Sequence, residues 1–201
     1  MAKTERRGAF RADIEKFYRV QFGNTSPSVV RKCRLWLKHF GLHCVAVYRF
    51  GKMAGRISQV SRLLGIPFVI VHVILNYWMQ FFHHVNIDDA TIGPGFFIGH
   101  VGTIYIGPVV IGENFSVTHN VTIGVGHSEG KTGLPSIGDN VWIGTGSVVS
   151  GAISVGNGVT IANGTMLTRS VGDGCLVAGN PGRVVMNSFD NSELLTKREL
   201  E

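Results

Sequence analysis

Three histidines in the middle of the chain, His100, His119 and His127, are its strongest candidates for acid–base chemistry. A neutral imidazole can take up a proton near physiological pH, because its ordinary pKa is about 6.5. Each histidine is therefore a candidate general base for activating a weak nucleophile such as a hydroxyl. Which of them can act depends on the elements that hold them.

An aliphatic residue recurs every six positions through the region that contains the three histidines. The twelve positions are Ile92, Ile98, Ile104, Ile111, Val117, Ile123, Ile137, Ile143, Val149, Val155, Ile161 and Leu167. A period of six fits neither an amphipathic helix nor an alternating strand. It is typical of a hexapeptide β-helix, in which three short strands form one triangular coil and the aliphatic side chain points inward. Twelve positions predict four coils around a dry core.

The repeat is interrupted twice. One extra residue separates Ile104 from Ile111, and eight extra residues separate Ile123 from Ile137. Residues 126–133 are rich in Gly and polar side chains and cannot fill a core, so we expect a loop that leaves the prism. A long loop in a compact repeat is often functional. The alternative is a plain solvent-exposed excursion.

The cysteines and the N-terminus favour a cytoplasmic protein. Cys33, Cys44 and Cys175 are far apart, odd in number and without CxxC spacing, which argues against disulfides or a structural zinc site. No apolar stretch of a secretory signal follows residues 1–7.

Three regions are expected: a helical N-terminal region at 1–84, a β-helix domain at 85–186 and a polar tail at 187–201. Helices are predicted at 8–22, about 28–62 and 64–82, with breaks at the Gly- and Pro-containing segments 23–27 and 65–67.

Charge is unevenly distributed between the two ends of the chain. Residues 1–62 hold 14 Lys and Arg against 3 Asp and Glu (+11), and residues 63–201 hold 5 against 10 (−5), which sum to the +6 of the chain. The basic part indicates an acidic partner, either anionic lipid, acidic polysaccharide or nucleic acid. No nucleic-acid-binding motif accompanies the charge, so nucleic acid is disfavoured.

Residues 63–82 are nearly all apolar and about long enough to span a membrane. His72, Asn76 and Gln80 are four residues apart and would form one polar stripe on a helix. Three interpretations remain open: a helix buried against trimer partners, an interfacial helix on a membrane, and a true span, which the three polar side chains make costly.

Four stretches resemble the serine acetyltransferase branch of the hexapeptide acyltransferases: IGPGFFIGH at 92–100, NVTIG at 120–124, IGDNVWIG at 137–144 and AGNPGRVV at 178–185. The resemblance covers about residues 85–186. It implies a left-handed parallel β-helix, a homotrimer, and acetyl-CoA in the groove between neighbouring prisms.

Acetyl transfer from a thioester to a hydroxyl needs a base and donors for the developing oxyanion. We expect direct transfer in a ternary complex, without a metal or an acyl-enzyme. By the resemblance, His100 stands at the catalytic histidine of serine acetyltransferases. His127 resembles the loop histidine of galactoside and xenobiotic acetyltransferases, and His119 stands where a non-ionisable polar residue is common.

The chain departs from the branch at several positions. The branch orients its histidine with an upstream aspartate, whereas Asn86 is nearest that place here, followed by Asp88 and Asp89. Any of these three could take the orienting role. The Asp and the Arg-His pair that grip serine are replaced by Gly99, Gly133 and Leu134. Because Gly cannot replace a bidentate Arg, an open neutral pocket for a sugar hydroxyl is predicted.

The resemblance also suggests where acetyl-CoA binds. Gly124, Thr145 and Gly146 match positions along the cofactor groove, and Lys131 and Arg183 are cations placed for its phosphates. The turn that contains Gly179 would close the groove, or serve only as a cap on the last coil.

These features predict a homotrimeric acetyl-CoA-dependent O-acetyltransferase with His100 as the base and a sugar or polysaccharide intermediate as the acceptor, located in the cytoplasm or at the inner membrane face. The alternatives are a serine O-acetyltransferase of cysteine biosynthesis and, from another class, a non-catalytic scaffold.

Overall fold

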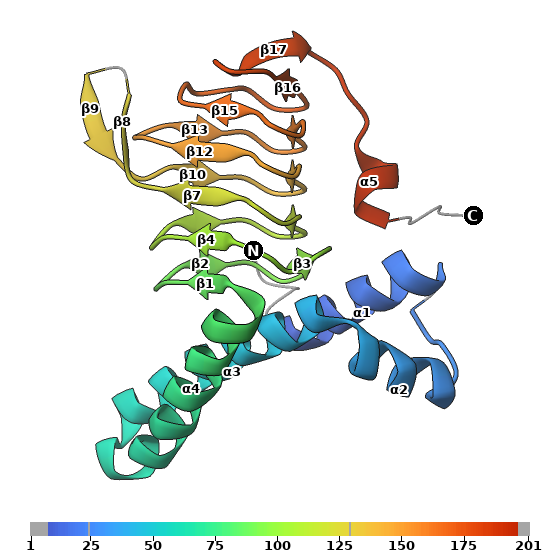
Figure 1. Cartoon of the computed structure of the whole chain (residues 1–201), viewed down its shortest axis with the longest axis vertical. Coiled ribbons are helices and arrows are strands. Elements are labelled where there is room, and N and C mark those ends of the chain that lie inside the picture. Colours follow the sequence, from blue (N-terminus) through green and yellow to red (C-terminus); the bar gives the residue numbers. More distant parts are fainter. Residues whose placement is uncertain (1–7, 24, 129, 197–201) are drawn as a thin grey trace.

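The computed structural model of the chain describes residues 8–23, 25–128 and 130–196. Its N-terminal helices gather at one end of a stack of short strands (Figure 1). Residues 1–7, where no secretory signal is expected, and the end of the polar tail lie outside the described residues.

The strands form a parallel β-helix with three faces. The first face holds β1 (Val85–Ile87), β4 (Ile104–Ile106), β7 (Thr122–Gly124), β12 (Val148–Ser150) and β15 (Met166–Leu167). The second holds β2 (Thr91–Ile92), β5 (Val110–Ile111), β10 (Ser136–Ile137) and β13 (Ser154–Val155). The third holds β3 (Phe97–Ile98), β6 (Ser116–Val117), β11 (Trp142–Ile143), β14 (Thr160–Ile161) and β16 (Leu176–Ala178), with β17 (Arg183–Met186) antiparallel at its edge.

The stack has five coils along its first face, one more than the predicted four. The end coils were missed because their spacing is irregular. Ile87 precedes Ile92 by five residues, and the bridging residue Val171 follows Leu167 by four. Strand pairing with the neighbouring coil holds these ends in register, which a strict period of six cannot reveal.

The predicted aliphatic core is confirmed. None of the twelve repeat residues is more than 4% exposed. A second buried set lies two residues before them and includes Phe96, Phe115, Val121, Val141 and Val159. The core of the prism is therefore filled by a repeat residue within each strand and by a second buried side chain directly before many of the strands.

The N-terminal region folds into α1 (Ala9–Phe22), α2 (Val29–Lys38), α3 (Phe40–Val60) and α4 (Arg62–His83). The predicted helix at 28–62 was wrong as one element, because His39 has φ −106° and ψ 87° and separates α2 from α3.

The predicted break at 65–67 was also wrong, since α4 begins earlier and contains both Gly65 and Pro67. The hydroxyl of Ser61 caps the helix by accepting from Leu64 N at 3.5 Å. Pro67, the sixth residue of α4, lacks the N–H that would bond the carbonyl of Leu63, yet the helix continues through it. Gly65 lies against Ser58 of α3, and a Cβ there would overlap the Ser58 backbone.

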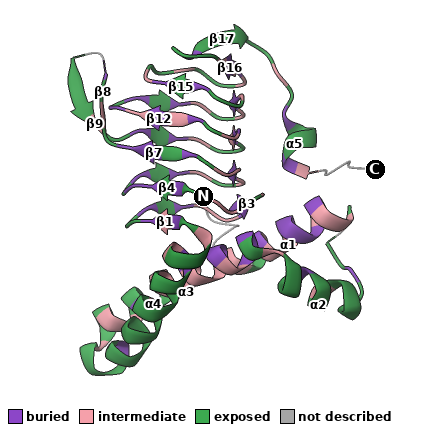
Figure 2. Ribbon diagram, viewed as in Figure 1, coloured by how far each residue is buried: buried purple, intermediate pink, exposed green. Residues whose placement is uncertain are grey.

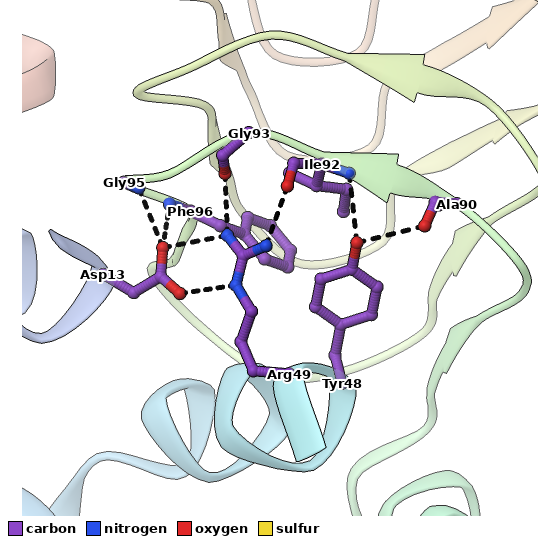
Figure 3. A network of polar contacts seen from close by, with 8 residues as sticks. All are labelled: Asp13, Tyr48, Arg49, Ala90, Ile92, Gly93, Gly95 and Phe96. Atoms are coloured by element: carbon purple, nitrogen blue, oxygen red, sulfur yellow. Dashed lines mark hydrogen bonds and ion pairs between the residues drawn. The ribbon is translucent and has the colours of Figure 1, made fainter. Parts of the chain in front are cut away.

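Polar side chains from α1 and α3 join the helices to the first coil (Figure 3). Asp13 is fully buried and accepts from the N–H groups of Gly95 and Phe96 at 2.8 and 2.7 Å. Arg49 pairs with Asp13 at 2.7 Å and also donates to the carbonyl of Gly93. Asp13 and Arg49 thereby provide the backbone groups at the open edge of the first coil with the hydrogen-bond partners that a further coil would otherwise supply.

The C-terminal tail returns along the prism to α5 (Ser192–Thr196), beside α1 (Figure 1). Asn191 is buried and its amide donates to the carbonyls of Asn140 and Gly158 at 2.9 and 3.2 Å. This side chain fixes the tail across two coils.

Candidate active site

His100 and His119 occupy one corner of the prism, where the third face turns into the first. Strands β3, β6 and β11 pair in register as Ile98, Val117 and Ile143. Two residues further on, His100, His119 and Thr145 therefore stack on successive coils. Adjacent coils are about 4.8 Å apart, so this corner forms a continuous column of side chains.

Hydrogen bonds fix the column in place. Thr145 Oγ1 donates to Thr118 Oγ1 at 3.1 Å, and Thr118 Oγ1 donates to the Ile143 carbonyl at 3.1 Å. The N–H of Gly146 donates to the His119 carbonyl at 3.3 Å. These bonds tie the second coil to the third at this corner.

His100 is the exposed histidine of this corner, and its ring is perpendicular to that of His119 at 5.9 Å between centroids. His119 is only half-exposed, and its buried Nδ1 finds no hydrogen-bond partner among the described residues. A base must reach solvent or substrate to exchange protons, so exposure favours His100, with His119 packed beneath it.

The three side chains proposed to orient His100 lie along the first coil. Asn86 accepts from Gln80 Nε2 at 3.5 Å. Asp88 accepts from the N–H of Asp89, and Asp89 pairs with Lys52 at 2.6 Å. The hydrogen bond from Lys52 lowers the pKa of Asp89.

Both aspartates follow β1, at the corner between the first and second faces, whereas His100 precedes the first face of the next coil. Within one chain Asn86 therefore lies nearer to the His100 corner than either aspartate.

The predicted extrusion at 126–133 is a β-hairpin of β8 (Gly126–Ser128) and β9 (Lys131–Gly133), which projects from the third coil (Figure 1). His127 is exposed and its Nδ1 lies 3.0 Å from Thr132 Oγ1 across the hairpin. The hairpin leaves the corner between the first and second faces, so one chain does not bring His127 to the corner of His100.

Residues 126–130 also have the Gly-x-Ser-x-Gly spacing of a nucleophile elbow, with Ser128 in the middle. An elbow needs a strand, a sharp turn and a helix, whereas Ser128 ends a strand that pairs antiparallel with β9. Ser128 is 5% exposed, and its Oγ has no hydrogen-bond partner among the described residues. Without access or an adjacent base this serine is not an activated nucleophile.

The predicted cofactor residues fall at three places. Thr145 and Gly146 belong to the His100 corner, while Gly124 and the exposed Lys131 belong to the hairpin corner. Gly179 and Arg183 lie at the far end of the stack, where Gly179 adopts φ 95°. One ligand could meet the first two groups only if the corners of two prisms face each other.

The structure also locates the positions at which the resembling branch has an Asp and an Arg-His pair and this chain has uncharged residues. Gly99 directly precedes His100, Gly133 ends the hairpin and Leu134 follows it. A Cβ at Gly133 would approach the Cβ of Ala152 to 2.9 Å, so this backbone leaves little room for a side chain. Among the described residues, no three His, Cys, Asp or Glu side chains cluster as metal ligands would.

The fold and the corner column define a hexapeptide-repeat transferase. The family described as "Bacterial transferase hexapeptide (six repeats)" matches residues 135–169. A serine acetyltransferase of Bacillus pumilus is 36% identical over 164 residues, which are 76% of this chain and 67% of the relative. That of Bacillus subtilis matches to the same extent.

Solved structures agree with these relatives. Brucella abortus serine acetyltransferase in complex with coenzyme A is 26% identical with a TM-score of 0.67, covering 93% of this chain and 70% of that one. The soybean apoenzyme is 27% identical with a TM-score of 0.64, covering 88% and 67%. The chain belongs to the serine acetyltransferase branch of the left-handed β-helix hexapeptide acyltransferases. The expected fold class and the expectation of an acetyltransferase, rather than a scaffold, are thus confirmed.

Proposed function

We propose that this protein transfers the acetyl group of acetyl-CoA to the hydroxyl of serine, with His100 as the general base. The observation that carries the proposal is the match to serine acetyltransferases over 76% of the chain. It supports serine better than the sugar or polysaccharide acceptor that the neutral pocket suggested.

The corner column suits direct transfer. His100 removes the hydroxyl proton while the oxygen attacks the thioester carbonyl. The tetrahedral intermediate then expels the coenzyme A thiolate, which takes the proton back from the imidazolium. Thr145 and Gly146 lie two coils along the same corner, so a pantetheine arm extended along the column would bring its thioester towards His100.

The separation of Gly124 and Lys131 from this corner supports a homotrimer. A neighbouring prism would bring its hairpin corner to the His100 corner, which gives the groove two walls. In that arrangement Lys131 is the hairpin cation available either to a cofactor phosphate or to the carboxylate of the acceptor. Arg183 would serve the phosphates at the far end.

A neutral hydroxylated acceptor is the second candidate, because of Gly99 and Gly133. An α-amino acid presents an ammonium and a carboxylate, and neither glycine offers a charge to them. The crowded Cβ position of Gly133 leaves little room for a compensating side chain.

Release of coenzyme A thiol from acetyl-CoA, measured on the purified full chain, separates the two candidates. L-serine is compared with its methyl ester, with 3-hydroxypropanoate, and with simple sugars and oligosaccharides. The proposal expects saturation by L-serine with kcat/KM near or above about 10⁴ M⁻¹s⁻¹. It also expects a marked loss when either charge of serine is removed. If both analogues react as fast as L-serine, or if a sugar is preferred to L-serine, the acceptor is instead a neutral hydroxyl compound.

A further inference from the structure

Helix α4 exposes apolar side chains on most of its surface. Between Leu63 and Phe82 it has no Asp, Glu, Lys or Arg. Ile70, Ile74 and Phe81 are 54, 55 and 69% exposed. Figure 2 shows the α3–α4 hairpin as an exposed arm that projects beyond the β-helix. By length and composition α4 could cross a membrane. Only 11% of its most apolar 18-residue segment is buried, unlike the core helix of a soluble protein.

The polar stripe of α4 faces inward. His72 lies against Gly51 of α3, where a Cβ would overlap its ring. Asn76 and Gln80 are half-buried on the same side, and Gln80 donates to Asn86. At 100° per residue, the packed positions Gly65, His72, Asn76, Met79 and Gln80 span roughly a 100° arc. About 260° of the helix surface is left over and is apolar.

This distribution is the reverse of that expected for a helix on the surface of a water-soluble protein, where the apolar face packs inward and the polar face is exposed. A single neighbouring helix covers only a stripe, so one second copy would leave much of the apolar surface in water. A fluid apolar medium can cover a broad face. Tyr77 and Trp78, 73 and 62% exposed, are also the aromatic types that gather at the membrane–water boundary.

The positive charge of the helical end indicates which kind of membrane surface would bind it. Residues 8–83 contain 11 Lys and Arg against 2 Asp and Glu, a net of +9. Arg56 and Arg62 are exposed at the tip of the α3–α4 hairpin, and α2 exposes Arg31, Arg34 and Lys38. Helices α1–α4 all lie at one end of the β-helix (Figure 1). Basic side chains beside an exposed apolar helix complement a bilayer with anionic headgroups.

We propose that the helical end of the protein docks on an anionic lipid bilayer, with α4 lying in the interfacial region and the β-helix in water. The helix lies in the plane of the interface and does not cross the bilayer, because α3 with Lys52 and Arg56 packs along it. The docked enzyme would work at the membrane surface, and the proposal does not depend on which hydroxyl is acetylated.

Sedimentation of the full chain with vesicles provides the first test. Binding is expected to vesicles that contain phosphatidylglycerol, to weaken as salt rises, and to be much weaker to pure phosphatidylcholine. A Val71→Gln, Val73→Gln variant should bind at least about tenfold more weakly. The matched variant Val110→Gln, Val125→Gln changes valines of the β-helix that are at least as exposed and should bind like the wild type.

A second measurement, tryptophan fluorescence, locates the contact. A variant that retains only Trp78 (Trp36→Phe, Trp142→Phe) should be quenched by brominated phosphatidylglycerol. A variant that retains only Trp142 (Trp36→Phe, Trp78→Phe) reports the third face of the β-helix and should not be quenched.

Three outcomes would overturn the proposal. They are failure of the wild type to bind anionic vesicles, equal quenching of Trp78 and Trp142, and a change of oligomeric mass in the Val71→Gln, Val73→Gln variant without lipid. The last outcome would identify the apolar face as a subunit interface.

Discussion

Asp13 of α1 and Arg49 of α3 form a salt bridge of 2.7 Å that joins two helices to the first coil of the β-helix (Figure 3). The carboxylate is fully buried and the guanidinium nearly so, at 0 and 12% side-chain exposure. Both partners also bond backbone groups of residues 92–96. Neither partner can be lost without leaving the other buried with an unmet charge.

Asp13→Ala should therefore destabilise the protein by about 3–5 kcal/mol, the usual cost of breaking a buried pair from one side. The measurement is the free energy of unfolding in urea, followed by circular dichroism. Glu15→Ala removes the exposed Glu15–Arg11 pair on the same helix and should cost about 1 kcal/mol or less. Similar losses in both variants would show that the buried network is not what attaches α1.

Gly65→Ala should destabilise the α3–α4 hairpin, because the new Cβ would overlap the backbone of Ser58. The expected loss is about 1–3 kcal/mol, as for overpacking at other close contacts. Gly55→Ala is the matched control, since a Cβ there meets nothing within 4 Å. It should stabilise α3 by about 0.5–1 kcal/mol through helix propensity. In thermal melts we expect the melting temperature to fall for Gly65→Ala and to rise for Gly55→Ala. A rise for both variants would mean that α4 does not approach α3 this closely at Gly65.

His100→Ala should lower kcat by about two to four orders of magnitude, which is the usual contribution of a positioned base. The KM for acetyl-CoA should stay near the wild-type value, because the side chain is not expected to hold the cofactor. His119→Ala and His127→Ala are tested in parallel, with oligomeric mass as the control for folding. If His127→Ala is inactive while His100→Ala is active, the base has been assigned to the wrong corner.

Lys131→Ala separates two roles for the hairpin cation. If it binds a cofactor phosphate, the KM for acetyl-CoA should rise several-fold, with the KM for the acceptor unchanged. If it binds the acceptor carboxylate, the KM for L-serine should rise and that for acetyl-CoA should not. Steady-state kinetics with each substrate varied in turn decide between them, and no change in either KM would exclude both roles.

The cysteines give a pH-dependent test of the fold. Burial raises the pKa of Cys44 from its ordinary value of 9.0 to about 12, whereas Cys33 is exposed. Reaction with a thiol reagent at pH 8–9 should therefore modify Cys33 rapidly and Cys44 slowly. Between pH 9 and 12 the unfolded chain loses the Cys44 proton while the folded chain keeps it, so stability should fall over that range. Rapid labelling of Cys44 in the folded protein would contradict its burial.

The sequence alone determined the β-helix and its core. A period of six cannot be satisfied by a helix or a flat strand, so Ile92 and its successors had to point into a prism. The excursion at 126–133 was likewise predictable, because Gly and polar residues cannot replace a core position, but its pairing as a β-hairpin was not. The histidines at 100 and 119 were recognisable as candidates by residue type, but their relative position was not evident from their spacing in the chain.

Tertiary structure decided the rest, because it depends on contacts between residues far apart in sequence. Strand pairing added an irregular fifth coil, and register placed His100, His119 and Thr145 on one corner while the hairpin left from another. Gly65 packs against Ser58 and so holds the start of α4 on α3, a long-range contact that the local Gly and Pro signals of this segment could not show. The stripe of His72, Asn76 and Gln80 could be seen in the sequence, but only packing against α3 turned it inward and left the apolar surface of α4 exposed.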